Sequence, residues 1–120
     1  DSVEIYIDGN HNHATTYESG DGQYIKGYND TGLSEKNSNT ANVLHAWSSI
    51  TVGYAVEIAI PWSSLGIIPT ADMVIGFDVA NNDDDNNSGC DSQVVWKGTI
   101  DNWQNTSAFG DMKLSGVIVN

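Results

Sequence analysis

The chain has 120 residues, of which 16 are Asp or Glu and four are Lys or Arg, so its formal net charge is −12 at pH 7. Nucleic acids and anionic membrane surfaces are bound by clustered cations, so this charge argues against both classes of partner and favours neutral ligands and hard cations. The length predicts one domain, residues 1–120; one cysteine excludes an internal disulfide, and no apolar run is long enough to span a membrane.

Alternation of apolar and polar residues predicts short β-strands along most of the chain. The clearest pattern is GYAVEIAI at residues 53–60, which we expect to be the central strand, with one bulky apolar face. Pro61 is expected to end it, because proline cannot donate to a sheet ladder, and a short helical turn should follow at 62–65. The other expected strands are 2–8, 23–28, 43–47, 73–81, 93–96 and 111–114.

Segments rich in Gly, Asn, Ser and Asp separate these strands and are expected to be loops, the longest being 29–40, 82–91 and 101–109. Many short strands joined by turn signals are typical of an all-β, antiparallel β-sandwich of the Ig-like or jelly-roll-like kind. We expect no helix longer than a turn or two. The sequence therefore predicts a single sandwich domain.

Two segments concentrate the hard oxygen ligands that Ca²⁺ prefers. The first is the loop 82–91, which carries Asp83, Asp84 and Asp85 but lacks the spacing of an EF-hand. The second is formed by Asp8, Glu18 and Asp21. Both segments carry candidate calcium ligands, and for both a solvated acidic loop is the slightly favoured interpretation.

His11 and His13 lie two residues apart in a loop rich in Gly and Asn. Two imidazoles can hold zinc or copper, but the sequence offers no obvious third ligand, and a mobile polar loop is the favoured interpretation. His45 alternates with apolar neighbours and is expected to be an ordinary strand residue. No metal site is predicted at these histidines.

The four tryptophans are expected to serve different purposes. Trp62 and Trp96 are predicted at the core or its rim, and Trp47 is left open. Trp103 lies in a polar loop flanked by Asp101, Asn102, Gln104 and Asn105. An exposed indole beside amides and carboxylates suits a sugar, whose C–H bonds stack on the ring while its hydroxyls bind the polar groups. The alternative is a Trp103 folded back over the edge of the sandwich.

Catalysis is not expected. The chain has no G-x-S-x-G motif and no Gly-rich phosphate loop. Glu4 and Glu57 could form a carboxylate pair for glycoside hydrolysis, but paired strand carboxylates are more often ligand contacts. Cys90 lies among acidic residues, which disfavour its thiolate.

The whole chain resembles the family 9 carbohydrate-binding modules and their relatives. The resemblance lies in an ordered set of short runs: DSVEIYID at 1–8, Asp21-x-Gln-Tyr24, Gly53-Tyr-x-Val-Glu through Trp62, Ile75-Gly-Phe-Asp78 with Asn82-Asp83, Trp96, and Phe109-Gly-x-x-x-Leu114. It implies a non-catalytic, calcium-stabilised β-sandwich that binds glucans or xylans. It also implies a secreted polysaccharide-degrading enzyme as parent chain, and strands that usually precede this opening.

The resemblance also assigns positions to the sugar site. Glu4 matches a strand glutamate that binds sugar hydroxyls, and Trp103 matches one of two stacking tryptophans, the other of which belongs upstream of residue 1. The position of a family glutamine is Ala80, with Asn81 next to it. The expected carbohydrate contacts are therefore Trp103, Glu4, Asn102, Asn81 and Gln104. The expected calcium ligands are Asp8, Glu18, Asp21, Asp83, Asp84 and Asp85.

Two other classes of function remain open on the sequence. One is a structural or adhesion sandwich that binds no sugar. The other is a haem-binding electron-transfer domain of related fold, for which Met73, Met112 and His45 supply the axial ligand types.

Overall fold

The computed structural model describes residues 1–116 and contains β-strands and two short 3₁₀ helices, with no α-helix in that range. The strands are β1 (Ser2–Asp8), β2 (Asp21–Gly27), β3 (Ser34–Glu35), β4 (Leu44–Ile50), β5 (Gly53–Ala59), β6 (Val74–Asp83), β7 (Ser92–Val95) and β8 (Gly110–Lys113). The helices are η1 (Trp62–Leu65) and η2 (Ile100–Trp103). None of these helices is long and apolar enough to cross a membrane.

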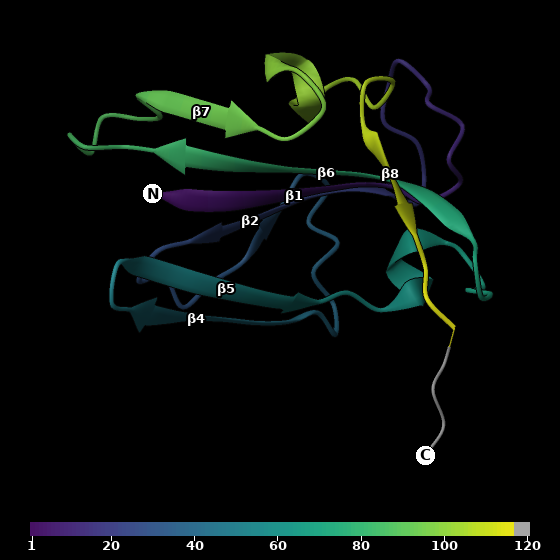
Figure 1. The fold of residues 1–120 in the computed structure, drawn as a ribbon, viewed down its shortest axis with the longest axis horizontal. Coiled ribbons are helices and arrows are strands. Elements are labelled where there is room, and N and C mark those ends of the chain that lie inside the picture. Colours follow the sequence, from purple (N-terminus) through teal and green to yellow (C-terminus); the bar gives the residue numbers. More distant parts are fainter. Residues whose placement is uncertain (117–120) are drawn as a thin grey trace.

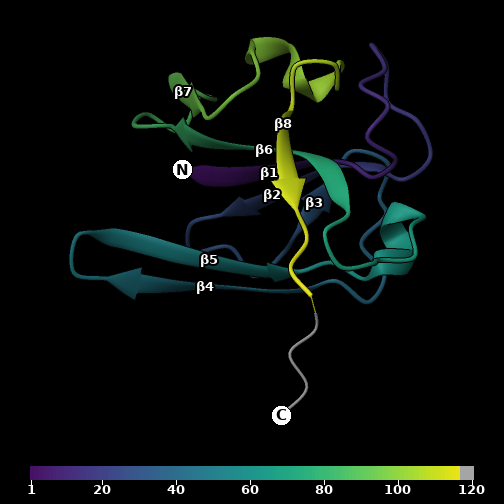
Figure 2. The same cartoon turned by 45° about the vertical axis from the view of Figure 1, so that its right-hand side comes forward.

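Two antiparallel sheets form the layers of the sandwich, as the sequence predicts (Figure 1). The larger sheet has six strands in the order β3-β2-β1-β6-β7, and β8 pairs with the other end of the long strand β6. The smaller sheet is the β4–β5 hairpin, which lies along one face of the larger sheet (Figure 2). The expected strands are confirmed, with ends that differ by at most three residues, and there is a short additional strand, β3.

The prediction that residues 53–60 form the central strand is wrong. β5 belongs to the two-stranded sheet, and β1 and β6 are the central strands of the domain, each paired on both sides. The alternation of β5 is real, because Val56, Ile58 and Ile60 face the larger sheet across a hollow of about 400 Å³. Periodicity identifies the apolar face of a strand but does not identify its neighbours.

The two faces of β1 belong to different environments. Ile5 and Ile7 point toward the hairpin, where Ile7 packs with Leu65 and Ile75 in one apolar cluster. Tyr6 points to the opposite face and packs with Ala80 and Phe109 in a second cluster. Polar residues also lie on that opposite face, namely Glu4 and Asp8 of β1 with Gln23, Asp21 and Asp78 of the neighbouring strands. The candidate functional residues gather on this second face.

Candidate functional site

A pocket on the polar face of the larger sheet joins the two residues that the sequence singles out most strongly. Glu4 from β1 and Trp103 from η2 both line it, together with Tyr6 as part of its wall. Its volume is about 370 Å³, and its remaining lining residues are Gln23, Cys90, Asp91, Ser92, Gln93 and Ile100. We call it the Trp103 pocket. Glu4 and Trp103 are 99 positions apart, so only the fold brings them together.

Glu4 is held in place by its neighbours on the sheet. Its carboxylate oxygen Oε2 accepts hydrogen bonds from the Tyr6 hydroxyl and, at 3.4 Å, from Nε2 of Gln93. Gln93 Nε2 also donates to Oδ1 of Asn82 at 2.7 Å, which fixes the orientation of its amide. Both bonds to Glu4 use the same oxygen, and within residues 1–116 no hydrogen bond to the second oxygen, Oε1, is found.

Trp103 is half exposed to solvent, with a relative accessible surface of 50% for the residue. Its backbone is fixed: the Trp103 carbonyl accepts from Nζ of Lys36 at 2.6 Å. The same ammonium lies 5.3 Å from the centroid of the indole ring. Trp103 is therefore half exposed and in contact with Lys36, and its role in stacking on a sugar stays a prediction.

Asn102 is a correction to the sequence prediction. It is only 1% exposed, and both ends of its amide are occupied within the protein. Its Nδ2 donates to Asp78 Oδ2 at 2.7 Å, and its Oδ1 accepts from Thr99 N at 2.9 Å and closes the capping box of η2. Asn102 therefore cannot bind a sugar directly; it holds the helix that carries Trp103.

Asp78 is the anchor for this arrangement. It is fully buried, and its carboxylate accepts from the backbone N–H groups of Lys97 and Gly98 as well as from Asn102. A Cβ atom at Gly98 would collide with both the Asn102 and Asp78 side chains, so this position requires glycine. Several N–H donors around one carboxylate compensate the cost of burying its charge.

The other predicted sugar contacts are placed differently. Asn81 is a second correction: it is the cross-strand partner of Val3, whereas Glu4 is paired with Ala80, so Asn81 and Glu4 lie on opposite faces of the sheet. Gln104 is exposed next to Trp103, and its amide donates to Asp101 at 3.2 Å. Its role in binding stays a prediction.

Sequence reasoning did not assign the polar groups that complete the pocket, chiefly Gln93 and Gln23. Gln23 is the cross-strand partner of Tyr6, and Gln93 that of Asn82. The alternation of β2 and β7 could have placed both amides on a polar face. No pattern in the sequence tells that this face is the one shared with Glu4.

A second feature of the same face is a pair of buried carboxylates. Asp8 and Asp21 are directly opposite one another on β1 and β2, and they are 0% and 6% exposed. Each has one oxygen that accepts from a backbone N–H: Asp8 Oδ2 from His13 at 2.9 Å and Asp21 Oδ2 from Glu18 at 2.8 Å. The other oxygen of each, Oδ1, is buried without a hydrogen-bond partner among the described residues.

The electrostatics of this acidic pair are unfavourable without a cation. Burial, reinforced by the charges of Asp8 and Glu18, raises the pKa of Asp21 to about 6. Like charges directly opposite on adjacent strands destabilise a sheet, and unpartnered buried oxygens add a desolvation cost. Glu18 is more exposed, and its carboxylate accepts from the side-chain amides of Asn10 and Asn12. Of the three predicted calcium ligands in this region, the fold thus places Asp8 and Asp21 opposite one another.

The loop after β6 is built differently. Asp84 Oδ1 accepts from the backbone N–H groups of Asn86 and Asn87, and Asp91 accepts from Asp85 N and the Asn86 amide. Within residues 1–116, the carboxylates of Asp83, Asp84 and Asp85 do not converge as three ligands for one ion. Their role as calcium ligands stays a prediction that this placement does not support.

The residues considered for haem ligation lie in different surroundings. Met73 and Met112 pack with the apolar cluster around Ile75, whereas His45 lies on β4 opposite Ile58. Met112 and His45 line separate hollows of the molecule. Within residues 1–116, no observation favours haem binding.

Comparisons with known proteins give the context of the pocket. A family model described as "Carbohydrate family 9 binding domain-like" matches residues 1–117. Endo-1,4-beta-xylanase A of Thermoanaerobacterium saccharolyticum is 39% identical over 117 residues, which are 97% of this chain and 10% of that protein. Exoglucanase XynX of Acetivibrio thermocellus is 38% identical over 117 residues, 97% of this chain and 11% of that protein. The chain thus spans about a tenth of the length of these relatives.

Solved structures agree in fold. A carbohydrate-binding module of family 9 from Caldicellulosiruptor kristjanssonii, in complex with glucose, superposes with a TM-score of 0.86 at 30% identity, covering 100% of this chain and 61% of that one. A second structure from the same organism, in complex with cellotriose, gives a TM-score of 0.85 at 29% identity, covering 100% and 63%. The similarity therefore extends over the whole chain and includes its sandwich architecture.

Proposed function

The chain belongs to the family 9 carbohydrate-binding modules, and we propose that it binds β-linked glucan or xylan in the Trp103 pocket. The observation that carries the proposal is the juxtaposition of Glu4, held by Tyr6 and Gln93, with the half-exposed indole of Trp103. The indole face stacks on the C–H bonds of a pyranose ring, while the carboxylate and the glutamine amides bind its hydroxyls. The glucose and cellotriose complexes of the similar modules support this class of ligand.

The module performs no reaction of its own under this proposal. Its role is to attach a secreted polysaccharide-degrading enzyme to its substrate. The relatives named as xylanases and as an exoglucanase, each about ten times longer than this chain, support such a parent protein and an extracellular location.

The experiment that tests the proposal is a tryptophan fluorescence titration with cello-oligosaccharides and xylo-oligosaccharides. We expect a saturable change with at least one of them. Replacing Trp103 by Ala should weaken binding by about 2 kcal/mol or more, roughly 30-fold, because aromatic anchors dominate such sites. The melting temperature of the Trp103→Ala variant should hardly change, because only a half-exposed indole is lost and the hydrogen bond from Lys36 Nζ to the backbone carbonyl of residue 103 remains.

Trp96→Ala is the matched control, because Trp96 is 53% exposed and lines a different hollow beside Val94. It should leave oligosaccharide affinity unchanged. Asn102→Ala tests the opposite case. It should destabilise the fold by about 2 kcal/mol, because the Asp78 carboxylate and the Thr99 N–H lose a buried hydrogen-bond partner, although Asn102 does not contact the sugar under this proposal. A flat titration with every oligosaccharide, or wild-type affinity in Trp103→Ala, would overturn the proposed function and favour a structural module.

We also propose that a calcium ion stabilises the module at the acidic pair. Asp8 and Asp21 fit this role, because each offers a buried carboxylate oxygen with no hydrogen-bond partner in residues 1–116 and the two face each other across β1 and β2. Backbone carbonyls of Gly20 and Leu65 lie close to Gly9, next to Asp8, and carbonyls are ordinary calcium ligands. The ion would offset the repulsion between the two carboxylates.

A further inference from the structure

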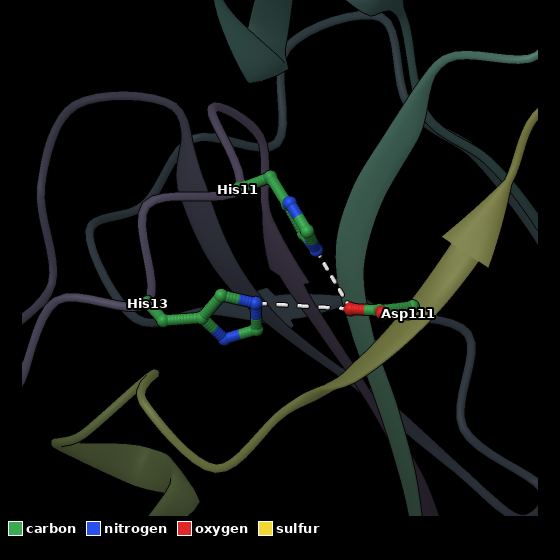
Figure 3. A group of neighbouring side chains, drawn as sticks. All are labelled: His11, His13 and Asp111. Atoms are coloured by element: carbon green, nitrogen blue, oxygen red, sulfur yellow. Dashed lines mark hydrogen bonds and ion pairs between the residues drawn. The ribbon is translucent and has the colours of Figure 1, made fainter.

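We propose that His11, His13 and Asp111 form a binding site for a divalent transition-metal ion such as Zn²⁺ or Co²⁺, distinct from the acidic pair and from the Trp103 pocket. Nε2 of His11 lies 2.7 Å from Oδ1 of Asp111, and Nε2 of His13 lies 3.7 Å from the same oxygen. Figure 3 shows both imidazole rings directed at this one carboxylate. Within residues 1–116, this is the group in which three His, Cys, Asp or Glu ligand atoms lie within 4.8 Å of one another.

The spacing suits a metal centre. In a tetrahedral zinc site with bonds near 2.0–2.1 Å, two ligand atoms are about 3.3 Å apart. The two measured distances, 2.7 and 3.7 Å, bracket this value. Small side-chain rotations would therefore place one ion between the three atoms. The chain supplies three ligands, which leaves a fourth position for water or another ligand, as in other open zinc sites.

The ligand types select the class of metal. Two imidazoles with one carboxylate suit Zn²⁺, Co²⁺, Ni²⁺ or Cu²⁺, whereas Ca²⁺ takes six to eight oxygen ligands. The acidic pair offers only oxygens, so the two places on the molecule prefer different ions. Calcium should not displace the transition metal from the histidines.

The local backbone supports a built arrangement. Both histidines adopt left-handed conformations, with φ of 57° for His11 and 52° for His13, which side-chain-bearing residues adopt rarely. Their rings pack edge to face with centroids 4.5 Å apart. The loop that carries both histidines is attached to the end of β1, because the His13 N–H donates to Asp8 Oδ2 at 2.9 Å. The sequence showed the His-x-His pair but not the third ligand, which comes from β8, 98 positions after His13.

Without metal, the three side chains are poorly matched. His11 can donate to Asp111, but His13 is too far from it for a hydrogen bond, and Nδ1 of His13 is buried without a partner among the described residues. An ion would replace the single hydrogen bond between His11 and Asp111 with three coordinate bonds. It would also join the loop after β1 to β8. That loop already contacts the Trp103-bearing segment, where Thr106 Oγ1 donates to the Ala14 carbonyl at 2.7 Å.

The test is calorimetric titration of the tag-free protein with Zn²⁺ in the presence of excess calcium, and with Co²⁺ followed by its visible absorption. We expect one saturable site, a Co²⁺ spectrum with imidazole coordination, and a higher melting temperature with Zn²⁺. His11→Gln and His13→Gln should each weaken binding about 100-fold or more, because even the loss of a partner that only orients a ligand costs 10–100-fold. Asp111→Asn should also weaken Zn²⁺ binding.

His45→Gln is the control, because it removes a histidine of β4 that is not part of the cluster. It should bind Zn²⁺ as the wild type does. Absence of saturable Zn²⁺ and Co²⁺ binding, or wild-type affinity in His11→Gln and His13→Gln, would overturn the proposal. The oligosaccharide titration does not involve these residues, so the two proposals fail independently.

Discussion

The two acidic regions of the molecule, the Asp8–Asp21 pair and the loop after β6, have similar compositions but differ in burial and in how their carboxylates are hydrogen-bonded. Asp8 and Asp21 belong to paired strands and are buried, and each keeps one carboxylate oxygen that has no hydrogen-bond partner in the described part of the chain. Asp84 and Asp91 belong to a loop, and their carboxylates are used by neighbouring backbone and amide N–H groups. Acidity alone therefore does not indicate a cation site. The unsatisfied buried oxygens are what support the proposed calcium site, because desolvation makes it costly to leave a carboxylate without compensation.

Of the changes considered, removal of calcium should have the largest effect on the stability of the protein. If an ion bridges the acidic pair at a concentration about 100 times its Kd, it contributes about 2.7 kcal/mol, so chelation should lower the melting temperature by about 10 °C. Asp21→Asn should show a much smaller difference between calcium and EDTA, because it removes one ligand charge. Scanning calorimetry of both proteins in both buffers measures this.

Asp111→Asn is the control for calcium, because Asp111 is an exposed carboxylate that lies outside the acidic pair. It should keep the full calcium-dependent shift. A wild-type melting temperature that is identical in calcium and EDTA would contradict the assignment of the acidic pair as a cation site.

The pH dependence of the calcium-free protein should show the second effect. The pKa of Asp21 is raised to about 6 from an ordinary value of 3.8, so the native state binds more protons than the unfolded state between these values. This contribution to stability is complete below the unfolded pKa and is lost as the pH rises through about 6. Calcium favours the charged carboxylate, so its addition should reverse the sign of the contribution.

Denaturant unfolding at a series of pH values, with and without calcium, would measure this. The informative quantity is the difference between wild type and Asp21→Asn, because it removes the contributions of the other carboxylates. If that difference were independent of pH from 4 to 7 without calcium, about the range in which a raised Asp pKa acts, the electrostatic description of the pair would be wrong.

Asp84→Asn should have the smallest effect. Asparagine keeps a side-chain oxygen that can accept from the N–H groups of Asn86 and Asn87, so the free energy of unfolding should change by about 0.5 kcal/mol or less. Its calcium-dependent shift should equal that of the wild type. If Asp84→Asn lost as much of the calcium response as Asp21→Asn, the ligand would be the loop after β6, and the difference between the two regions would disappear.

Much of the fold could be predicted from the sequence, because strand alternation and turn residues are local signals. The alternation of 2–8 places Glu4, Tyr6 and Asp8 on one face and Val3, Ile5 and Ile7 on the other, and the structure confirms this partition. The position of β5 in the sandwich could not be predicted this way. Which strands become neighbours depends on pairing between distant segments.

The candidate sites show the same division. Trp103 and Glu4 could be singled out from residue type and resemblance, and the fold places both in one pocket. Asn102 was predicted to bind sugar because it flanks Trp103, but its amide turns inward to Asp78, 24 positions earlier. Flanking position in a loop does not determine which side chain points outward.

The sequence by itself determined the all-β class, the faces of the strands, the acidic character and the residue types available for sugar and metal. The tertiary structure alone decided which of these residues meet: Glu4 with Trp103, Asp8 with Asp21, and two loop histidines with Asp111. The physical reason is the sequence distance over which each interaction acts. Alternation and turn chemistry act between residues a few positions apart, whereas a binding site is made by strand pairings that close contacts across almost the whole chain.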